Sequence, residues 1–238
     1  MAPRCWFHLG ITLACVTLLA ACASTTTPHQ ITEQSLPAVE QTVFPSQVIH
    51  SADLAPFTRW TSVETRFAAQ ELPGICTADT DGTCTQARWA TLIDDLKARP
   101  LADRIERVNQ VLNAIPYMPA TQNWGSPAYW ETPFEFLARG GQCQNYAISK
   151  YLALAASGVP DSAMRVAVVH DRQTNQDHAI LIVTVDGHDL VLDNMTPIVD
   201  PLESVTRYRA YYAINNSGWW AYFDSTTRFA GTQIAAVQ

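Results

Sequence analysis

Residues 142–156 limit how this chain can fold more than any other stretch, because the helix that they predict is apolar on most of its sides. Such a helix has no polar face to turn toward water, so it has to lie at the centre of a domain. Gly158 and Pro160 mark its end. Two glycines precede it, and Cys143 stands in its first turn. We therefore expect a domain built around a central helix that begins with a cysteine.

The spacing of apolar residues differs on the two sides of this helix. Before it they recur every three or four positions, which predicts helices, and after it every two positions, which predicts strands. Asp186-Gly187 is a strong hairpin signal. Helices followed by an antiparallel sheet predict an α+β domain. We expect helices over residues 62–70, 86–98 and 101–115, a short helix capped by Thr132-Pro133, and strands over residues 164–169, 178–185, 188–193 and 208–214.

The first 21 residues have the features of a secretory signal. Arg4 supplies a positive charge, and residues 9–20 form an uncharged apolar run that is too short to span a bilayer. The run ends in Leu-Ala-Ala before Cys22, a string that resembles a bacterial lipobox, in which the cysteine is lipidated. The alternative is an ordinary small-residue cleavage site. With no acidic residue at position 23, we expect a lipid-anchored protein on the periplasmic side of the outer membrane.

The remainder of the chain divides into a tether and one domain. Residues 22–55 are rich in Thr, Pro, Gln and Ser and predict a flexible tether, which leaves residues 56–238 as a domain of ordinary size. The chain has 15 Lys and Arg against 22 Asp and Glu, a formal net charge of −7. An acidic protein of this size is a poor candidate for binding nucleic acid.

Three cysteines follow Cys22 in the sequence, namely Cys76, Cys84 and Cys143. Cys76 and Cys84 flank a loop-like segment, and in an oxidising compartment they could form a disulfide. Two free thiols are the alternative. A zinc site is not expected, because no histidine lies near and the spacing is not C-x-x-C. If the bridge forms, Cys143 is unpaired, and a reactive thiol would explain it.

Cys143 has surroundings that suit a nucleophile. A helix N-terminus offers free N–H groups and a positive dipole end, which favour a thiolate and can hold an oxyanion. The alternative is a buried structural cysteine.

The predicted hairpin brings a histidine and a carboxylate together. With a two-residue turn, Ile180 lies opposite Asp193, so His178 and Asp193 share a face at roughly 7–8 Å between backbones. A Cys–His–Asp set would let His178 take the thiol proton while Asp193 orients the imidazole. His170 and His188 compete as the base, and a surface histidine and a turn aspartate are the alternatives.

Five segments resemble one known family, the bacterial transglutaminase-like cysteine proteinases. The likeness spans roughly residues 70–222 and implies a papain-like or transglutaminase-like fold. It implies Cys143 as nucleophile, His178 as base and Asp193 as third member, with Trp124 as an oxyanion-hole candidate. The segments are residues 123–133 (Asn-Trp-Gly-Ser-Pro-Ala-Tyr-Trp-Glu-Thr-Pro), 140–151 (Gly-Gly-Gln-Cys-Gln-Asn-Tyr-Ala-Ile-Ser-Lys-Tyr), 177–179 (Asp-His-Ala), 191–194 (Val-Leu-Asp-Asn) and 216–220 (Asn-Ser-Gly-Trp-Trp).

The resemblance also carries expectations about partners and cofactors. The LapG-type periplasmic proteases of this family cleave surface adhesins, need calcium and are sequestered by a membrane receptor. Their typical Asp-Cys-Glu-Asp is replaced here by Gln142-Cys143-Gln144-Asn145. Calcium prefers charged oxygen ligands, so we expect no metal cofactor, and we expect receptor control to differ. The function expected is a cysteine peptidase acting on exported or surface proteins. Another acyl transfer, such as transglutaminase or amidase activity, and a non-catalytic binding module of the same fold are the alternatives.

Overall fold

The computed structural model describes residues 47–71, 74–79 and 81–223. These residues all belong to one unit of the chain, residues 36–238. The predicted signal, the lipidation candidate Cys22 and most of the predicted tether lie outside the described residues.

Helices occupy the first half of the domain, as the apolar spacing predicts. The capped helix is confirmed in detail: Thr132 accepts from the Glu135 backbone N–H, Glu135 accepts from the Thr132 N–H, and Pro133 opens the helix. The first helix begins earlier than expected, at Thr58, and α4 was not predicted. The helices are α1 (Thr58–Gln70), α2 (Thr85–Lys97), α3 (Leu101–Asn113), α4 (Ala120–Trp124), α5 (Pro133–Arg139) and α6 (Cys143–Ala156).

The strands form one antiparallel sheet in the order β1-β7-β6-β2-β3-β4-β5. The four predicted strands are present, and three others were not predicted. The strands are β1 (Gln47–Ser51), β2 (Met164–Asp171), β3 (Gln176–Val185), β4 (His188–Leu192), β5 (Asp200–Pro201), β6 (Tyr208–Asn215) and β7 (Gly218–Phe223), with short 3₁₀ turns η1 (Asp161–Ala163) and η2 (Leu202–Ser204).

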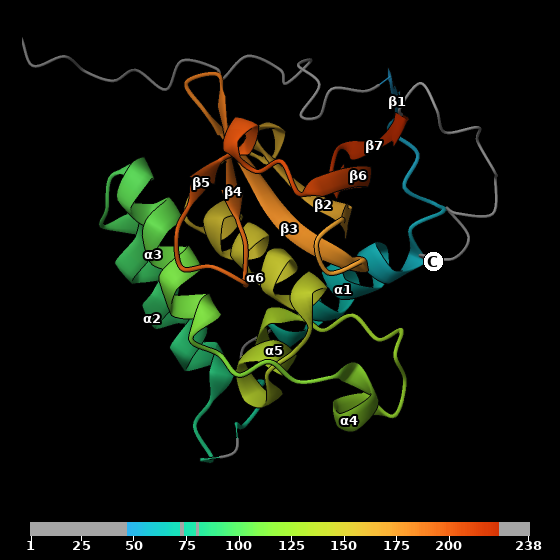
Figure 1. Ribbon diagram of the computed structural model, residues 1–238. Coiled ribbons are helices and arrows are strands. Elements are labelled where there is room, and N and C mark those ends of the chain that lie inside the picture. The colour runs from blue at the N-terminus through green and yellow to red at the C-terminus, as the bar shows by residue number, and fades with distance from the viewer. Residues whose placement is uncertain (1–46, 72–73, 80, 224–238) are drawn as a thin grey trace, which may run out of the picture. The chain divides into compact units, whose positions relative to one another are not determined.

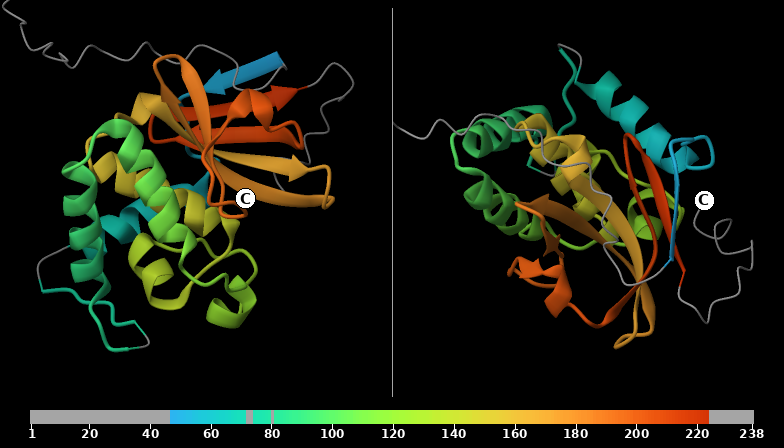
Figure 2. Two further views of the ribbon diagram at one scale, coloured as in Figure 1. Left: turned by 60° about the vertical axis from the view of Figure 1, so that its left-hand side comes forward. Right: turned by 90° about the horizontal axis from the view of Figure 1, so that it is seen from above.

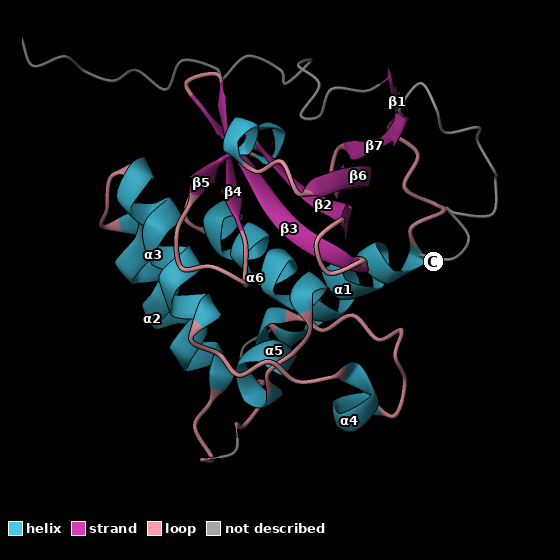
Figure 3. Cartoon of the chain, in the orientation of Figure 1, coloured by secondary structure: helices cyan, strands magenta, loops and turns pink. Residues whose placement is uncertain are grey.

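The helices gather on one side of this sheet, with α6 lying along β3 (Figures 1 and 2). Ile148 and Leu154 of α6 are fully buried and belong to the same apolar core as Leu181 and Val183 of β3. The central position of α6 follows from its lack of a polar face. A second, smaller core covers the other side of the sheet, where Ile180 and Ile182 point. Apart from β1, the strands follow the six α-helices of the described residues along the chain. The strands form one sheet and the helices lie beside it (Figure 3), which confirms the α+β class.

The structure differs from the expected tether at its C-terminal end. Residues 47–51 form β1, which pairs with β7 in register from Gln47 opposite Phe223 to Ser51 opposite Trp219. Val48 packs against the second core, whereas Ile49 is exposed. A five-residue strand at the edge of a sheet is stabilised by its partner strand, so its own short sequence carries little signal. The segment that precedes the domain therefore ends before Gln47.

Cys76 and Cys84 pair as a disulfide, with their Cα atoms 5.4 Å apart. The bridge closes the loop that enters α2, where Arg88 also binds the Asp79 carboxylate at 2.8 Å. Among the described residues, Cys143 is the free cysteine.

Candidate active site

Cys143 is the first residue of α6, and its position depends on the two glycines before it. Gly140 has a φ of 74°, a left-handed conformation that favours glycine, and a Cβ there would lie 2.2 Å from the Pro116 carbonyl oxygen. A Cβ on Gly141 would lie 2.5 Å from Glu131 Oε2. Cys143 is partly exposed and its Sγ lies 3.6 Å from Gln144 Oε1. The glycine pair thus lets the chain turn sharply so that the thiol meets solvent at a helix N-terminus.

His178 and Asp193 lie together as the hairpin geometry predicts. Val185 faces His188 and Leu181 faces Leu192, so the two-residue turn is present and the expected parity holds. His178 Nε2 lies 2.8 Å from Asp193 Oδ1, and both side chains are buried, with 8% and 2% exposure. Cys143 lies close enough to His178 for its thiol to contribute to the raised pKa of that histidine. Because Nε2 is engaged by Asp193, Nδ1 is the ring nitrogen left for the thiol.

The charges in this group favour a protonated histidine. Burial alone would lower the pKa of His178, but hydrogen bonds to Asp193 and Cys143 outweigh it and raise that pKa to about 9. Burial likewise would raise the pKa of Asp193, yet His178, Tyr208 and the Met195 N–H stabilise its carboxylate and hold the pKa well below its usual range. The surroundings therefore support a protonated imidazole beside the Asp193 carboxylate.

Two residues that sequence reasoning missed complete the surroundings of Asp193. The Tyr208 hydroxyl donates to Asp193 Oδ2 at 2.5 Å, and Arg207 Nη2 donates to the same oxygen at 3.0 Å. The Tyr208 ring also lies 5.6 Å from the His178 ring, centroid to centroid. Tyr208 is the first residue of β6 and Arg207 directly precedes it, and β6 reaches this site through its pairing with β2. No local pattern indicates that contact.

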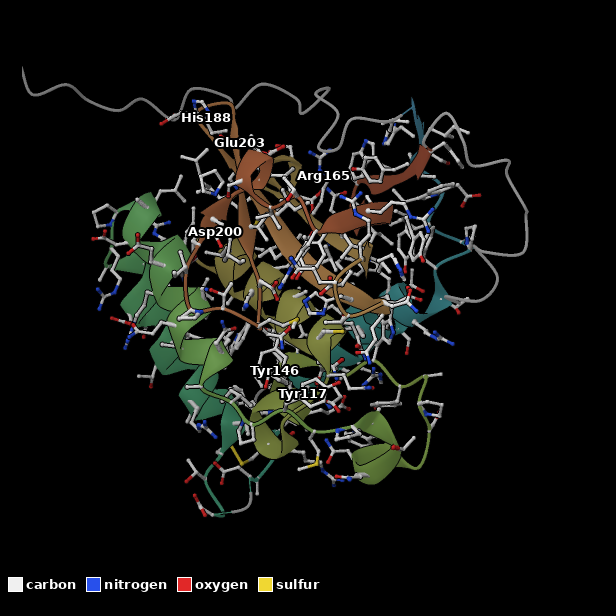
Figure 4. The ribbon with its side chains drawn as sticks, viewed as in Figure 1. Tyr117, Tyr146, Arg165, His188, Asp200 and Glu203 are labelled. Carbon is white, nitrogen blue, oxygen red and sulfur yellow. A yellow bond between two sulfur atoms is a disulfide. The ribbon has the colours of Figure 1, made fainter. Side chains whose placement is uncertain are left out.

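The two competing histidines lie elsewhere. His170 Nδ1 is 3.1 Å from Asp177 Oδ1, and its ring lies beside that of Tyr211. His188 is exposed in the β3–β4 turn, at the end of β4 opposite to Asp193 (Figure 4). Of the three histidines, His178 is thus the one that the structure brings to Cys143.

Trp124, the oxyanion-hole candidate, uses its indole N–H elsewhere. Trp124 Nε1 donates to Glu131 Oε1 at 2.7 Å, and its ring stacks on Tyr129. Burial raises the pKa of Glu131 to about 7. In this structure the N–H groups at the start of α6 are the donors nearest in sequence to the thiol.

Most of the domain matches one family of known proteins. Residues 75–228 match the bacterial transglutaminase-like cysteine proteinases. The chain belongs to this family. The matched segment contains Cys143, His178 and Asp193, and cysteine proteinase activity is the activity that the family's description supports.

Solved structures give the same result for the fold. Legionella pneumophila LapG in a calcium-bound structure is 26% identical, covers 71% of this chain and 93% of its own, and has a TM-score of 0.54. A second LapG structure is 28% identical over 69% of this chain and 88% of its own, with a TM-score of 0.53. An EGTA-treated LapG, 24% identical over 74% of this chain and 94% of its own, with a TM-score of 0.54, has the same fold.

Among proteins with curated descriptions, none matches the chain closely. None of the helices in the described part of the chain combines the length and the apolar character needed to cross a bilayer.

Proposed function

We propose that this protein is a cysteine peptidase in which Cys143 is the nucleophile, His178 the general base and Asp193 the residue that orients it. The observation that carries the proposal is the buried His178 imidazole, which bonds Asp193 through Nε2 at 2.8 Å and lies close enough to Cys143 for that thiol to contribute to its raised pKa. A nucleophile, a base within reach and a third group that orients the base form the minimum set for covalent acyl transfer.

The proposed reaction proceeds in two halves. His178 takes the Cys143 proton, and the thiolate attacks the carbonyl carbon of a peptide bond to give a tetrahedral intermediate. The first N–H groups of α6 stabilise its oxyanion. His178 then protonates the leaving amine, which departs and leaves an acyl-enzyme. A water molecule, deprotonated by His178, hydrolyses the thioester and restores the thiol. Asp193 stays ionised throughout and stabilises the imidazolium.

The substrate class that we propose is an exported or surface protein. The signal-like residues 1–21 and the lipobox-like Cys22 support a lipid-anchored enzyme on the periplasmic side of the outer membrane. Family membership supports a protein substrate. By resemblance, a surface adhesin is the substrate to test first, and a membrane receptor is the regulator to test first.

The decisive experiment is the pH dependence of Cys143 alkylation, followed by peptide mapping, in wild type, His178→Ala and His170→Ala. We expect a thiol that reacts near neutral pH, a loss of about a hundredfold in His178→Ala, and no change in His170→Ala, since His170 bonds Asp177 instead. A slow thiol that is indifferent to His178→Ala would refute the proposal and favour a binding module.

A further inference from the structure

The polar side chains behind the nucleophile form a cluster that the peptidase mechanism does not use. Glu131 and Asn145 are both fully buried, and both lie against Gly141, two residues before Cys143. We call Glu131, Asn145, Asn123 and Trp124 the amide–carboxylate cluster. Its members come from α4, α6 and the segment before α5, so it joins three parts of the fold at the turn that positions the thiol.

Hydrogen bonds connect the cluster to the backbone of this turn. The Glu131 N–H donates to Asn145 Oδ1 at 3.1 Å, and the Trp124 indole N–H donates to Glu131 Oε1 at 2.7 Å. Asn123 Nδ2 donates to the Gly140 carbonyl at 3.1 Å and lies 3.4 Å from Glu131 Oε1. The cluster therefore holds the turn by one hydrogen bond to Gly140, while Glu131 and Asn145 lie close against Gly141.

The orientation of Asn145 matters for what can bind there. Its Oδ1 already accepts the Glu131 N–H, so its amide NH₂ is the group that faces Gly141. Glu131 Oε2 and Asn145 Nδ2 lie 2.5 and 2.7 Å from the position of a Cβ on Gly141, and no hydrogen bond from the described residues engages either atom. A carboxylate oxygen and an amide N–H thus face the same point, which is electrostatically favourable, whereas a cation there would meet the amide hydrogens.

The oxygen donors around the nucleophile do not fit calcium. Calcium takes six to eight oxygen ligands, usually with several carboxylates among them. Here Glu131 supplies one carboxylate, and burial raises its pKa to about 7. Of the three amide side chains, Gln144 has its Oε1 beside the thiol and Asn145 has its Oδ1 engaged by the Glu131 N–H. Gln142 Oε1 is buried and has no hydrogen-bond partner among the described residues. No three His, Cys, Asp or Glu side chains of the described residues come together as a metal site.

We infer that this protein positions its nucleophile without a divalent cation, and that Asn145 and Glu131 are the positioning residues that replace one. This separates the chain from the calcium-bound LapG structure that it resembles. The part of the inference that concerns Cys143 reactivity rests on the proposed peptidase function. The part that concerns cation binding does not.

The first test compares the full wild-type protein in millimolar calcium and in EGTA. We expect the same thermal unfolding midpoint and the same rate of Cys143 alkylation in both solutions. A midpoint that rises with calcium, or an alkylation rate that EGTA lowers, would overturn the inference. If Cys143 does not react in either solution, the peptidase proposal fails, and the unfolding midpoint still decides the question of the cation.

The second test places a carboxylate at position 145. Asn145→Asp keeps the oxygen that accepts the Glu131 N–H but places a second buried carboxylate beside Glu131. We expect alkylation in EGTA to slow between about tenfold and about a hundredfold as repulsion displaces the turn. Gln110→Glu, which adds the same charge at an exposed position on α3, is the matched control. A purely structural role would lower the unfolding midpoint but leave alkylation of the folded protein unchanged.

The third test adds the remaining carboxylates. We expect the variant Gln142→Asp, Gln144→Glu, Asn145→Asp to regain fast alkylation and a higher unfolding midpoint when calcium is added. If this variant folds and ignores calcium, the three amides are not what excludes the cation. If it does not fold, the comparison of wild type in calcium and EGTA decides.

Discussion

At the scale of single residues, the Asp193 carboxylate organises the site by accepting hydrogen bonds from two sides. His178 Nε2 and the Met195 N–H bind Oδ1 at 2.8 and 2.9 Å, while Tyr208 and Arg207 bind Oδ2. The two donors on Oδ2 keep that carboxylate in one orientation, so that Oδ1 meets the histidine. Charge and orientation are therefore supplied by the same group.

Replacing Asp193 by Asn tests this double role. An amide cannot neutralise an imidazolium, so the pKa of His178 should fall from about 9 by about one to two units. The ring should also lose its orientation, and we expect Cys143 alkylation at neutral pH to slow by about a hundredfold or more. NMR titration of the His178 ring C–H signals measures the first effect directly.

Asp177→Asn is the matched control, since it removes the same charge one residue from His178, where the carboxylate is 65% exposed and faces His170. Equal shifts in the two variants would contradict a specific role for Asp193. The direction in which pH changes the stability of the protein follows from the same raised pKa of His178. This histidine contributes stability that is complete below its unfolded pKa, near 6.5, and that is lost as pH rises through about 9.

At the scale of elements, a feature of the fold can be predicted from the sequence when neighbouring residues determine it. The β3–β4 hairpin has its turn signal at Asp186-Gly187, where Asp186 has a φ of 51°, and the parity of the two strands then follows. That parity alone predicts that His178 and Asp193 share a face of the sheet. Strand β1 and the contact of Tyr208 with Asp193 depend on pairing between segments that are far apart in the sequence. The residues of one segment alone do not indicate which distant segment it pairs with.

Helix α6 carries a buried lysine that the sequence did not single out. Lys150, two turns after Cys143, is fully buried and donates to Asn109 Oδ1 at 2.7 Å. Asn109 in turn donates to the Pro197 carbonyl at 3.2 Å, and Asn113, one turn further along α3, donates to the Asp193 carbonyl at 2.8 Å. The two helices thus brace the segment that carries Asp193.

Lys150→Met should change how stability depends on pH. Burial lowers the pKa of Lys150 to about 7, against about 10.4 in an unfolded chain. Between these values the unfolded state binds a proton that the native state does not, so the stability of the wild type rises with pH. Between pH 7 and 10, we expect the free energy of unfolding of the wild type to increase by a few kcal/mol more than that of Lys150→Met.

Urea unfolding across that pH range measures the difference. Lys97→Met removes an exposed lysine from α2 and is the control. If wild type and Lys150→Met gave parallel curves, Lys150 would be protonated in the folded protein and the bracing arrangement would need a charge.

At the scale of the whole molecule, the boundary set by β1 would decide how far the active site of a lipid-anchored protein could stand from its membrane. If Cys22 is lipidated, residues 23–46 separate the lipid from the first residue of the sheet. Their Thr-, Pro-, Gln- and Ser-rich composition predicts a coil, and a coil of that length has an end-to-end distance of roughly 25–30 Å. A peptidase held at this range would meet proteins at the same membrane more often than proteins free in the periplasm.

Cys22→Ala tests this arrangement in cells. We expect the wild type to incorporate labelled fatty acid and to fractionate with the outer membrane, and we expect Cys22→Ala to lose the label and appear in the soluble periplasmic fraction. Cys15→Ala, a change within the expected leader, should leave both properties unchanged. Because Cys22 is remote in sequence from Cys143, alkylation of Cys143 should be equal in all three proteins.

If Cys22→Ala reduced cleavage of a membrane-bound substrate but not of the same substrate in solution, anchoring would act through local concentration. Retention of label and membrane association by Cys22→Ala would instead mean that another residue carries the anchor.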